Sequence, residues 1–225
     1  MLHALSLTRQ DDDPRPMFLK PLLARQLARP RGLAGLLMRG VLNKVNARVN
    51  RTALDLLELR PDDRLLDIGF GGGLVLREAL HRLPEGFVAG IEISEPMLKL
   101  ARRTFHRELR AGRLDVKEGN VSSIPYPDAS FSRVTAVNTL HFWPDPSAGL
   151  REARRVLKPG GRIVIVLRPK AYLDRIRFTS YGFTAYDDDR LRALLEGAGL
   201  ADVRVESRED GRMGMQLALA TRSGE

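Results

Sequence analysis

The sequence predicts an α/β fold built on a seven-stranded, mostly parallel β-sheet, and two observations carry this prediction. From Arg64 onward, short apolar runs alternate with stretches of helical periodicity, which is the pattern of successive strand–helix units. Near the C-terminus, Asp210-Gly211 separates two strand-like runs, and Asp-Gly in such a place is a strong hairpin signal. Five parallel strands closed by an antiparallel C-terminal hairpin are therefore expected.

The expected elements follow one another without internal repeats. Strands lie near 64–68, 87–92, 113–117, 131–137 and 161–168, and the hairpin strands cover 202–208 and 213–221. Helices are expected near 73–83, 95–109, 147–157 and 187–198. This order is typical of a Rossmann-like domain, which we place at residues 60–225.

Residues 1–59 are expected to form an N-terminal helical extension. Residues 1–16 are polar and suggest a mobile arm. Two or three amphipathic helices fit the rest, because apolar residues recur there at helical spacing. Examples of these apolar residues are Leu33, Leu37, Val41, Val45 and Val49.

The positive charge of the chain is concentrated in the same extension. Between Pro14 and Leu54 there are nine basic residues and no acidic one, which equals the formal net charge of +9 of the whole sequence. A basic amphipathic segment of this kind predicts a lid over the domain, a peripheral contact with an anionic membrane, or both. Its apolar side could also pack on the domain while the cations are solvated.

Composition excludes several other kinds of site. The absence of cysteine removes disulfides, thiolate metal ligands and cysteine nucleophiles, and the four histidines have no metal-ligand spacing. We therefore expect no metal. No apolar run is long enough for a membrane-spanning helix and the start lacks a signal-peptide pattern, so we expect a cytoplasmic protein.

The most informative segment runs from Arg64 to Leu74, where an apolar strand leads into Asp67 and then into a turn with Gly69, Gly71 and Gly73. Strand, acid, spaced glycines and helix together favour a nucleotide-type ligand over a plain flexible turn. A dinucleotide fingerprint would need its third glycine at Leu74, so pyrophosphate fits poorly. Asp67 would repel phosphate but could accept hydrogen bonds from an ammonium group. S-adenosylmethionine (SAM) has that ammonium and no phosphate.

Asp67-Ile68-Gly69-Phe70-Gly71-Gly72-Gly73 resembles motif I of the class I SAM-dependent methyltransferases, in a variant common among small-molecule and lipid methylating members. Gly90-Ile91-Glu92-Ile93-Ser94 resembles the end of the family's second strand, which implies that Glu92 holds both ribose hydroxyls. Glu118-Gly119-Asn120-Val121 resembles the turn after the third strand. There Asn120, where many relatives have Asp, and the next backbone N–H would read the adenine edge, although Gly-Asn could equally be a turn without a ligand.

The resemblance also places Ile93, Val121 and Asn138 among the cofactor contacts and covers about residues 60–170. Ile124 to Asn138 resembles the family's loop and fourth strand. Leu157-Lys158-Pro159-Gly160-Gly161-Arg162 resembles its turn into the fifth strand, which we interpret as a tight structural reversal.

Acceptor contacts are expected beyond the fourth and fifth strands, because ligands of such sheets lie at the carboxyl ends of the strands. His141 is the candidate general base, although it could equally hydrogen-bond a neighbouring loop. Phe142 and Trp143 either line an apolar pocket or belong to the core. Cations after the fifth strand could bind an anionic acceptor or be solvated; with a nearby tyrosine, these residues are Arg168, Lys170, Tyr172, Arg175 and Arg177.

These features predict a methyltransferase that acts on a small-molecule or lipid-like acceptor by direct displacement, a reaction that needs alignment rather than a catalytic triad. A nucleic-acid methyltransferase is the alternative that the basic charge suggests. The Asn/Asp-Pro-Pro-aromatic motif of amine-methylating nucleic-acid enzymes is absent, since Asn138 is followed by Thr139-Leu140-His141. A second alternative is a non-catalytic SAM-binding module.

Overall fold

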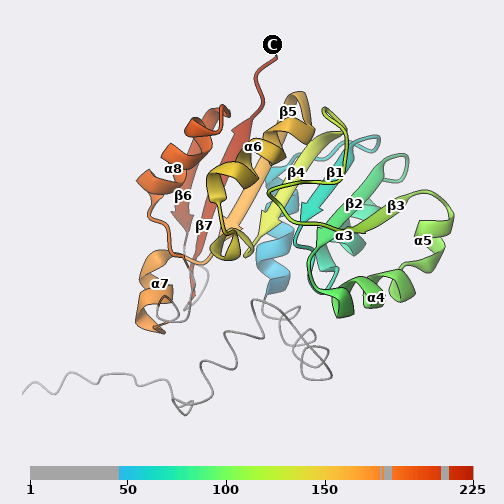
Figure 1. The fold of residues 1–225 in the computed structure, drawn as a ribbon, viewed down its shortest axis with the longest axis horizontal. Coiled ribbons are helices and arrows are strands. Elements are labelled where there is room, and N and C mark those ends of the chain that lie inside the picture. Colours follow the sequence, from blue (N-terminus) through green and yellow to red (C-terminus); the bar gives the residue numbers. More distant parts are fainter. Residues whose placement is uncertain (1–45, 178, 180–183, 209–212, 225) are drawn as a thin grey trace, which may run out of the picture.

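The computed structural model describes residues 46–177, 179, 184–208 and 213–224, and they form one seven-stranded sheet with helices on both faces (Figure 1). The strand order is β3-β2-β1-β4-β5-β7-β6. The strands are β1 (Arg64–Ile68), β2 (Phe87–Glu92), β3 (Leu114–Glu118), β4 (Phe131–Val137), β5 (Leu157–Leu167), β6 (Ala201–Arg208) and β7 (Met215–Thr221). The predicted Rossmann-like fold class is confirmed.

The strand order reverses beside β1, and in open α/β sheets a crevice forms at such a point, outside the carboxyl ends of the strands. β1 pairs in parallel with β2 on one side and with β4 on the other, with Asp67 opposite Gly90 and Thr135. The chain runs outward from β1 through β2 to β3, and then crosses over to β4 and β5. A reversal of strand order of this kind is where ligands bind in open α/β sheets.

The helices agree with the predicted ones except in three places. They are α3 (Leu74–Arg82), α4 (Glu95–Thr104), α5 (His106–Arg110), η1 (Leu140–Phe142), α6 (Pro146–Val156), α7 (Lys170–Arg175) and α8 (Asp188–Gly197). The short helices η1 and α7 were not predicted. The helix predicted at 95–109 is broken at Phe105, whose side chain turns into the core and lies close to Gly73.

Residues 46–56 are helical and pack on the same face of the sheet as α3 and α4. Val49, Ala53 and Leu54 have no exposed surface, and neither does Leu57 just after the helix. This part of the predicted N-terminal extension therefore directs its apolar side into the domain core. The other apolar positions of the extension, Leu33, Leu37, Val41 and Val45, lie outside the described residues.

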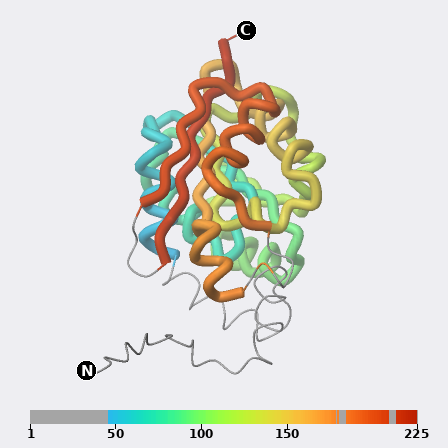
Figure 2. Tube along the Cα trace, turned by 90° about the vertical axis from the view of Figure 1, so that its left-hand side faces the viewer, coloured from blue at the N-terminus to red at the C-terminus, as the bar shows by residue number. Residues whose placement is uncertain are grey.

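The C-terminal strands form the predicted antiparallel pair, with Arg208 opposite Met215, and Figure 2 shows them side by side at the edge of the sheet. The Asp210-Gly211 turn lies outside the described residues. At the start of β5, where a tight reversal was predicted, the strand pairing is irregular. Phe131 pairs with Leu157 but Arg133 pairs with Arg162, and Gly160 between these two pairs has φ +71°. The Gly160 amide donates to the carbonyl of Arg222 at 2.8 Å.

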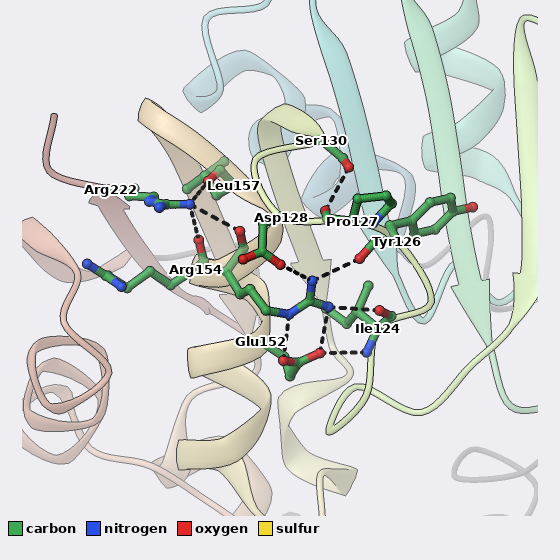
Figure 3. A network of polar contacts seen from close by, with 10 residues as sticks. Ile124, Tyr126, Pro127, Asp128, Ser130, Glu152, Arg154, Leu157 and Arg222 are labelled. Atoms are coloured by element: carbon green, nitrogen blue, oxygen red, sulfur yellow. Dashed lines mark hydrogen bonds and ion pairs between the residues drawn. The ribbon is translucent and has the colours of Figure 1, made fainter. Parts of the chain in front are cut away.

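The loop between β3 and β4 is fastened to α6 by one guanidinium group (Figure 3). Arg155 donates to both carboxylate oxygens of Glu152, to Asp128, and to the carbonyls of Ile124 and Tyr126, at 2.7–2.9 Å. All five of its N–H donors are thereby used. Hydrogen bonds to Glu152 and Asp128 raise the pKa of Arg155 further above its ordinary value. The loop that begins at the predicted adenine contacts is therefore held in one conformation.

Within the described part of the chain, every helix is too short or too polar to pass through a lipid bilayer. The same residues contain no cluster of three or more acidic, histidine or cysteine side chains that could hold a metal ion.

Arg155→Ala is expected to destabilise the protein by about 2 kcal/mol, since two carbonyls and two carboxylates lose a charged donor. Urea unfolding followed by circular dichroism measures this change. Arg151→Ala is the matched control, because Arg151 is exposed on the same helix, and its change should stay within about 0.5 kcal/mol. Equal stability of the two variants would show that the network does not hold the loop.

Candidate active site

Asp67 occupies the centre of the crevice and is almost completely buried, with 2% of its surface exposed. Its Oδ2 atom has no hydrogen-bond donor among the described residues. Burial and, secondarily, the negative charge of Glu92 raise the pKa of Asp67 to about 8. A buried carboxylate without a donor is costly, so this atom is suited to receive a donor group, above all a cationic one, from a ligand.

The glycine turn after β1 has a conformation that side chains oppose. Gly69 has φ +74°, and a Cβ there would lie 2.5 Å from Cγ2 of Thr139. Gly71 has φ +48°, and the nearest atom to a Cβ there would be 4.0 Å away, so the space beside it is open. Gly69 therefore permits the close approach of the β4 end, and Gly71 leaves room beside the turn where a ligand can lie.

Glu92 at the end of β2 ties this turn to the neighbouring strand. Its Oε2 accepts from the Gly71 amide at 3.0 Å, and its Oε1 accepts from the amides of Ile93 and Ser94 at 2.9 Å. Burial nevertheless keeps the pKa of Glu92 above its ordinary value. A carboxylate has about four acceptor positions, of which three are taken. In the described conformation one acceptor position, on Oε2, therefore remains for a ribose hydroxyl, and the binding of both ribose hydroxyls by Glu92 stays a prediction.

The residues predicted to contact adenine lie on the β2–β3 side of the crevice. Among the large apolar side chains of the described residues, Ile93 alone is exposed, at 46%. β3 runs beside β2, and the Gly119 amide donates to the Glu92 carbonyl at 3.3 Å, which brings Asn120 and Val121 to the same edge. Asn120 is exposed, and its Oδ1 accepts from the Ser122 amide at 3.1 Å, which leaves one lone pair for a ligand. Val121 is buried.

Asn138 follows β4 and has a left-handed backbone conformation, with φ +56°. The backbone N–H of Asn138 donates to the Val166 carbonyl at 2.7 Å. The hydroxyl of the next residue, Thr139, donates to the Ile68 carbonyl at 3.2 Å. The β4 end is thereby fixed against the glycine turn. The side-chain Oδ1 atom of Asn138, like Oδ2 of Asp67, is buried and has no hydrogen-bond donor among the described residues.

His141 lies in η1, four residues beyond the end of β4, and is 3% exposed. Its Nδ1 is 2.8 Å from the carbonyl oxygen of Thr184, which can only accept, so Nδ1 carries a proton and Nε2 is the basic nitrogen of the neutral ring. Burial lowers the pKa of His141, and so does the charge of Arg168, although the bond to Thr184 opposes them. The ring is therefore neutral at pH 7. The bond to the Thr184 carbonyl fits the role of a loop anchor, whereas the base role requires that an acceptor reach Nε2, which is buried.

The remaining acceptor candidates divide between core and surface. Trp143 is buried in the apolar core beside Leu150 and packs against Gly149, whereas Phe142 is only partly buried. Arg168 is also buried, at 7% exposure, and is not part of a solvated loop. On α7, Lys170 pairs with Asp174, and the guanidinium of Arg175 lies 5.3 Å from the centroid of the Tyr172 ring. Arg177 follows this helix and is exposed.

The residues around the crevice suit SAM chemically. The buried Asp67 oxygen fits an ammonium group, the remaining position on Glu92 fits a ribose hydroxyl, and exposed Ile93 offers an apolar surface to a base. The open space beside Gly71 adjoins Glu92, because the Gly71 amide donates to Oε2 of that residue. A phosphate group fits this arrangement poorly, because the carboxyl groups of Asp67 and Glu92 lie at the turn.

Comparison with known proteins gives consistent matches. The methyltransferase domain family matches residues 66–165. The protein named uncharacterized methyltransferase YdaC of Bacillus subtilis is 30% identical over 125 residues, which cover 56% of this chain and 67% of that protein. The 27-O-demethylrifamycin SV methyltransferase of Amycolatopsis mediterranei is 35% identical over 179 residues, 75% of this chain and 64% of that enzyme. The ubiquinone/menaquinone biosynthesis C-methyltransferase UbiE of Geotalea daltonii is 35% identical over 117 residues, 52% of this chain and 50% of that enzyme.

Solved structures share the fold at lower identity. A chain in the complex between the Haloferax volcanii Trm112 methyltransferase activator and a methyltransferase superposes with a TM-score of 0.71 and 19% identity, covering 84% of this chain and 94% of that one. The Haemonchus contortus phosphoethanolamine N-methyltransferase 2 in complex with SAM gives a TM-score of 0.63 and 16% identity, over 78% of this chain and 52% of that one. The family match, the relatives and the fold agree with the chemistry of the crevice, and the chain belongs to the class I SAM-dependent methyltransferases, with SAM as its cofactor.

Proposed function

We propose that this methyltransferase transfers the methyl group of SAM to a small-molecule or lipid-like acceptor by direct displacement at the carboxyl edge of the sheet. The observation that carries the proposal is the buried Asp67 oxygen, which has no donor among the described residues and adjoins a glycine turn with open space beside it. When bound, SAM supplies a methyl group on a sulfonium centre, so a nucleophile can take the methyl without a covalent enzyme intermediate.

The cofactor contacts that we propose follow the crevice from β4 to β3. Asp67 and Asn138 accept hydrogen bonds from the amino-acid end, and Oε2 of Glu92 accepts one from the ribose. Gly69, Gly71 and Gly73 give the turn its shape. The Ile93 side chain packs on the adenine face, and Asn120 and the Val121 amide bind the adenine edge. Alignment of this kind can remove about 7–11 kcal/mol from the barrier of a displacement reaction.

His141 is the residue that we propose as general base. The Thr184 carbonyl fixes its tautomer, and its lowered pKa keeps Nε2 unprotonated at neutral pH. Nε2 would remove the proton from an acceptor N–H or O–H as the new bond to the methyl carbon forms. An acceptor that is already nucleophilic would need the site only for alignment.

The choice of acceptor class rests on the relatives and on the β4 end. The matched relatives include enzymes named for rifamycin and for ubiquinone/menaquinone biosynthesis, both of which have small organic acceptors. The residues after Asn138 lack the proline pair of amine-methylating nucleic-acid enzymes. Since the match spans half to two thirds of those two enzymes, the acceptor of the whole protein is part of the proposal.

A peripheral contact with anionic membranes through residues 14–54 also belongs to the proposal. Its support is the run of nine basic residues without an acidic one. In the described part of that segment, Val49, Ala53 and Leu54 are buried, whereas Arg48 and Arg51 are exposed and Arg51 pairs with Glu78 at 3.3 Å. The apolar side of residues 46–54 is therefore not available to a membrane. Any contribution of this stretch would come from its cations, which makes the contact sensitive to salt.

Tritium-labelled SAM incubated with separated fractions of cell extract tests the acceptor class. The fractions are polar metabolites, RNA, and lipids presented either in anionic or in zwitterionic vesicles. We expect the label in a metabolite or lipid fraction, and faster labelling with anionic vesicles at low salt if the acceptor is a lipid. Label in RNA would establish the nucleic-acid alternative, and no label in any fraction would favour a non-catalytic module.

Two substitutions of His141 separate a base from a loop anchor. His141→Asn keeps an N–H near the position of Nδ1 for the Thr184 carbonyl but has no basic nitrogen, whereas His141→Ala removes both. With the labelled fraction as acceptor, we expect both variants to lose about 10² or more in turnover and to keep the affinity for S-adenosylhomocysteine. Normal turnover of His141→Asn beside an inactive His141→Ala would reduce His141 to an anchor.

A further inference from the structure

Three polar side chains from distant parts of the sequence meet beyond the ends of β4 and β5. Nη2 of Arg168 donates to Oδ1 of Asn46 at 3.2 Å, and Nδ2 of Asn138 donates to the same oxygen at 3.3 Å. Nη1 of Arg168 donates to the Gly214 carbonyl at 2.7 Å. Asn46 belongs to the helix 46–56, so the N-terminal segment reaches the edge where the cofactor site lies.

The chemistry of these groups fixes the orientation of both amides. A guanidinium can only donate hydrogen bonds, so the Asn46 atom that faces Arg168 must be its oxygen. That oxygen can only accept, so the Asn138 atom that faces it must be the amide nitrogen. Oδ1 of Asn138 consequently points away from Asn46. Without Asn46, the terminal amide of Asn138 could rotate and exchange its oxygen for its nitrogen, since this torsion has two broad minima.

Oδ1 of Asn138 and Oδ2 of Asp67 are two buried acceptors without donors among the described residues, and both adjoin one turn. Asp67 directly precedes Ile68, and the Thr139 hydroxyl bonds the Ile68 carbonyl while its methyl group touches Gly69. Asn138 is also held in a left-handed conformation that is uncommon for residues other than glycine. Strain of this kind persists where the surrounding structure imposes it, often at a ligand site.

We propose that Asn46 and Arg168 are positioning residues for the cofactor, and that they hold the Asn138 amide so that its oxygen and Oδ2 of Asp67 together accept the ammonium group of SAM. An ammonium has three donors and needs more than one acceptor when it is buried. This inference rests on the cofactor site proposed above. According to this inference, the helix 46–56 contributes to the cofactor site, although it lies outside the glycine turn in the sequence.

Two ligands that differ only at the amino-acid end test the inference. S-adenosylhomocysteine carries the ammonium, whereas 5′-methylthioadenosine has the same adenine, ribose and thioether without it. Calorimetry on the full chain should show that Asn46→Ala weakens S-adenosylhomocysteine binding about tenfold and leaves 5′-methylthioadenosine binding unchanged. Asn46→Asp retains an oxygen for both donors and should bind both ligands like the wild type.

Two further variants control for folding. Asn50→Ala removes a buried asparagine one turn further along the same helix and should preserve the affinity for both ligands. Asn46→Gln keeps an amide on a good helix former but shifts its oxygen by one methylene, so it should show the same selective loss as Asn46→Ala even if the latter folds poorly.

Equal losses for both ligands in Asn46→Ala and Asn46→Gln, or unchanged binding of S-adenosylhomocysteine, would overturn the inference. A selective loss in Asn46→Asp equal to that in Asn46→Ala would also contradict it, because the oxygen is still present. A wild-type protein that binds neither ligand would overturn the proposed cofactor site, and the inference with it.

Discussion

The buried carboxylate of Asp67, placed beside Glu92, is the constraint on which the rest of the site depends. Burial raises the pKa of Asp67 from its ordinary 3.8 to about 8. Between these two values the folded protein holds a proton that the unfolded chain releases, so the free energy of unfolding falls as the pH rises across this window. Asp67 accordingly destabilises the protein at neutral pH, and its Oδ2 receives no compensating hydrogen bond from the described residues. A cationic ligand that donates a hydrogen bond to Oδ2 would offset this loss of stability.

The strands and the glycine turn around Asp67 hold its carboxyl group in a position that a ligand can reach. The reversal of strand order beside β1 opens the crevice, and positive φ angles at Gly69 and Gly71 let the chain leave β1 without covering it. Glu92 links the turn to β2 through the Gly71 amide. Thr139 links the turn to β4 through the Ile68 carbonyl. The same elements carry the proposed adenine contacts on one side and His141 on the other, so the cofactor and acceptor regions share one rigid edge of the sheet.

Much of this arrangement could be predicted, because it is encoded locally. Alternating apolar runs located all seven strands, and the spacing of Asp67, Gly69 and Gly71 located the crevice. Contacts between distant residues have no such local pattern. The bond between Asn46 and Asn138 spans 92 positions and that between Asn46 and Arg168 spans 122. The three backbone amides that bond Glu92 and the break at Phe105 likewise depend on packing. This is why the prediction of one unbroken helix at 95–109 differs from the structure.

The Asp67 carboxylate is proposed to receive the ammonium group of the cofactor, and proton release on binding tests this role most directly. At pH 7 a group with a pKa of about 8 is mostly protonated, and an ammonium partner favours its ionised form. Titration calorimetry with S-adenosylhomocysteine in buffers of different ionisation enthalpy should therefore show release of nearly one proton, and the affinity should rise with pH up to about 8. Asp67→Asn should abolish the release. Binding of the wild type without proton release, or an undiminished release from Asp67→Asn, would contradict the claim.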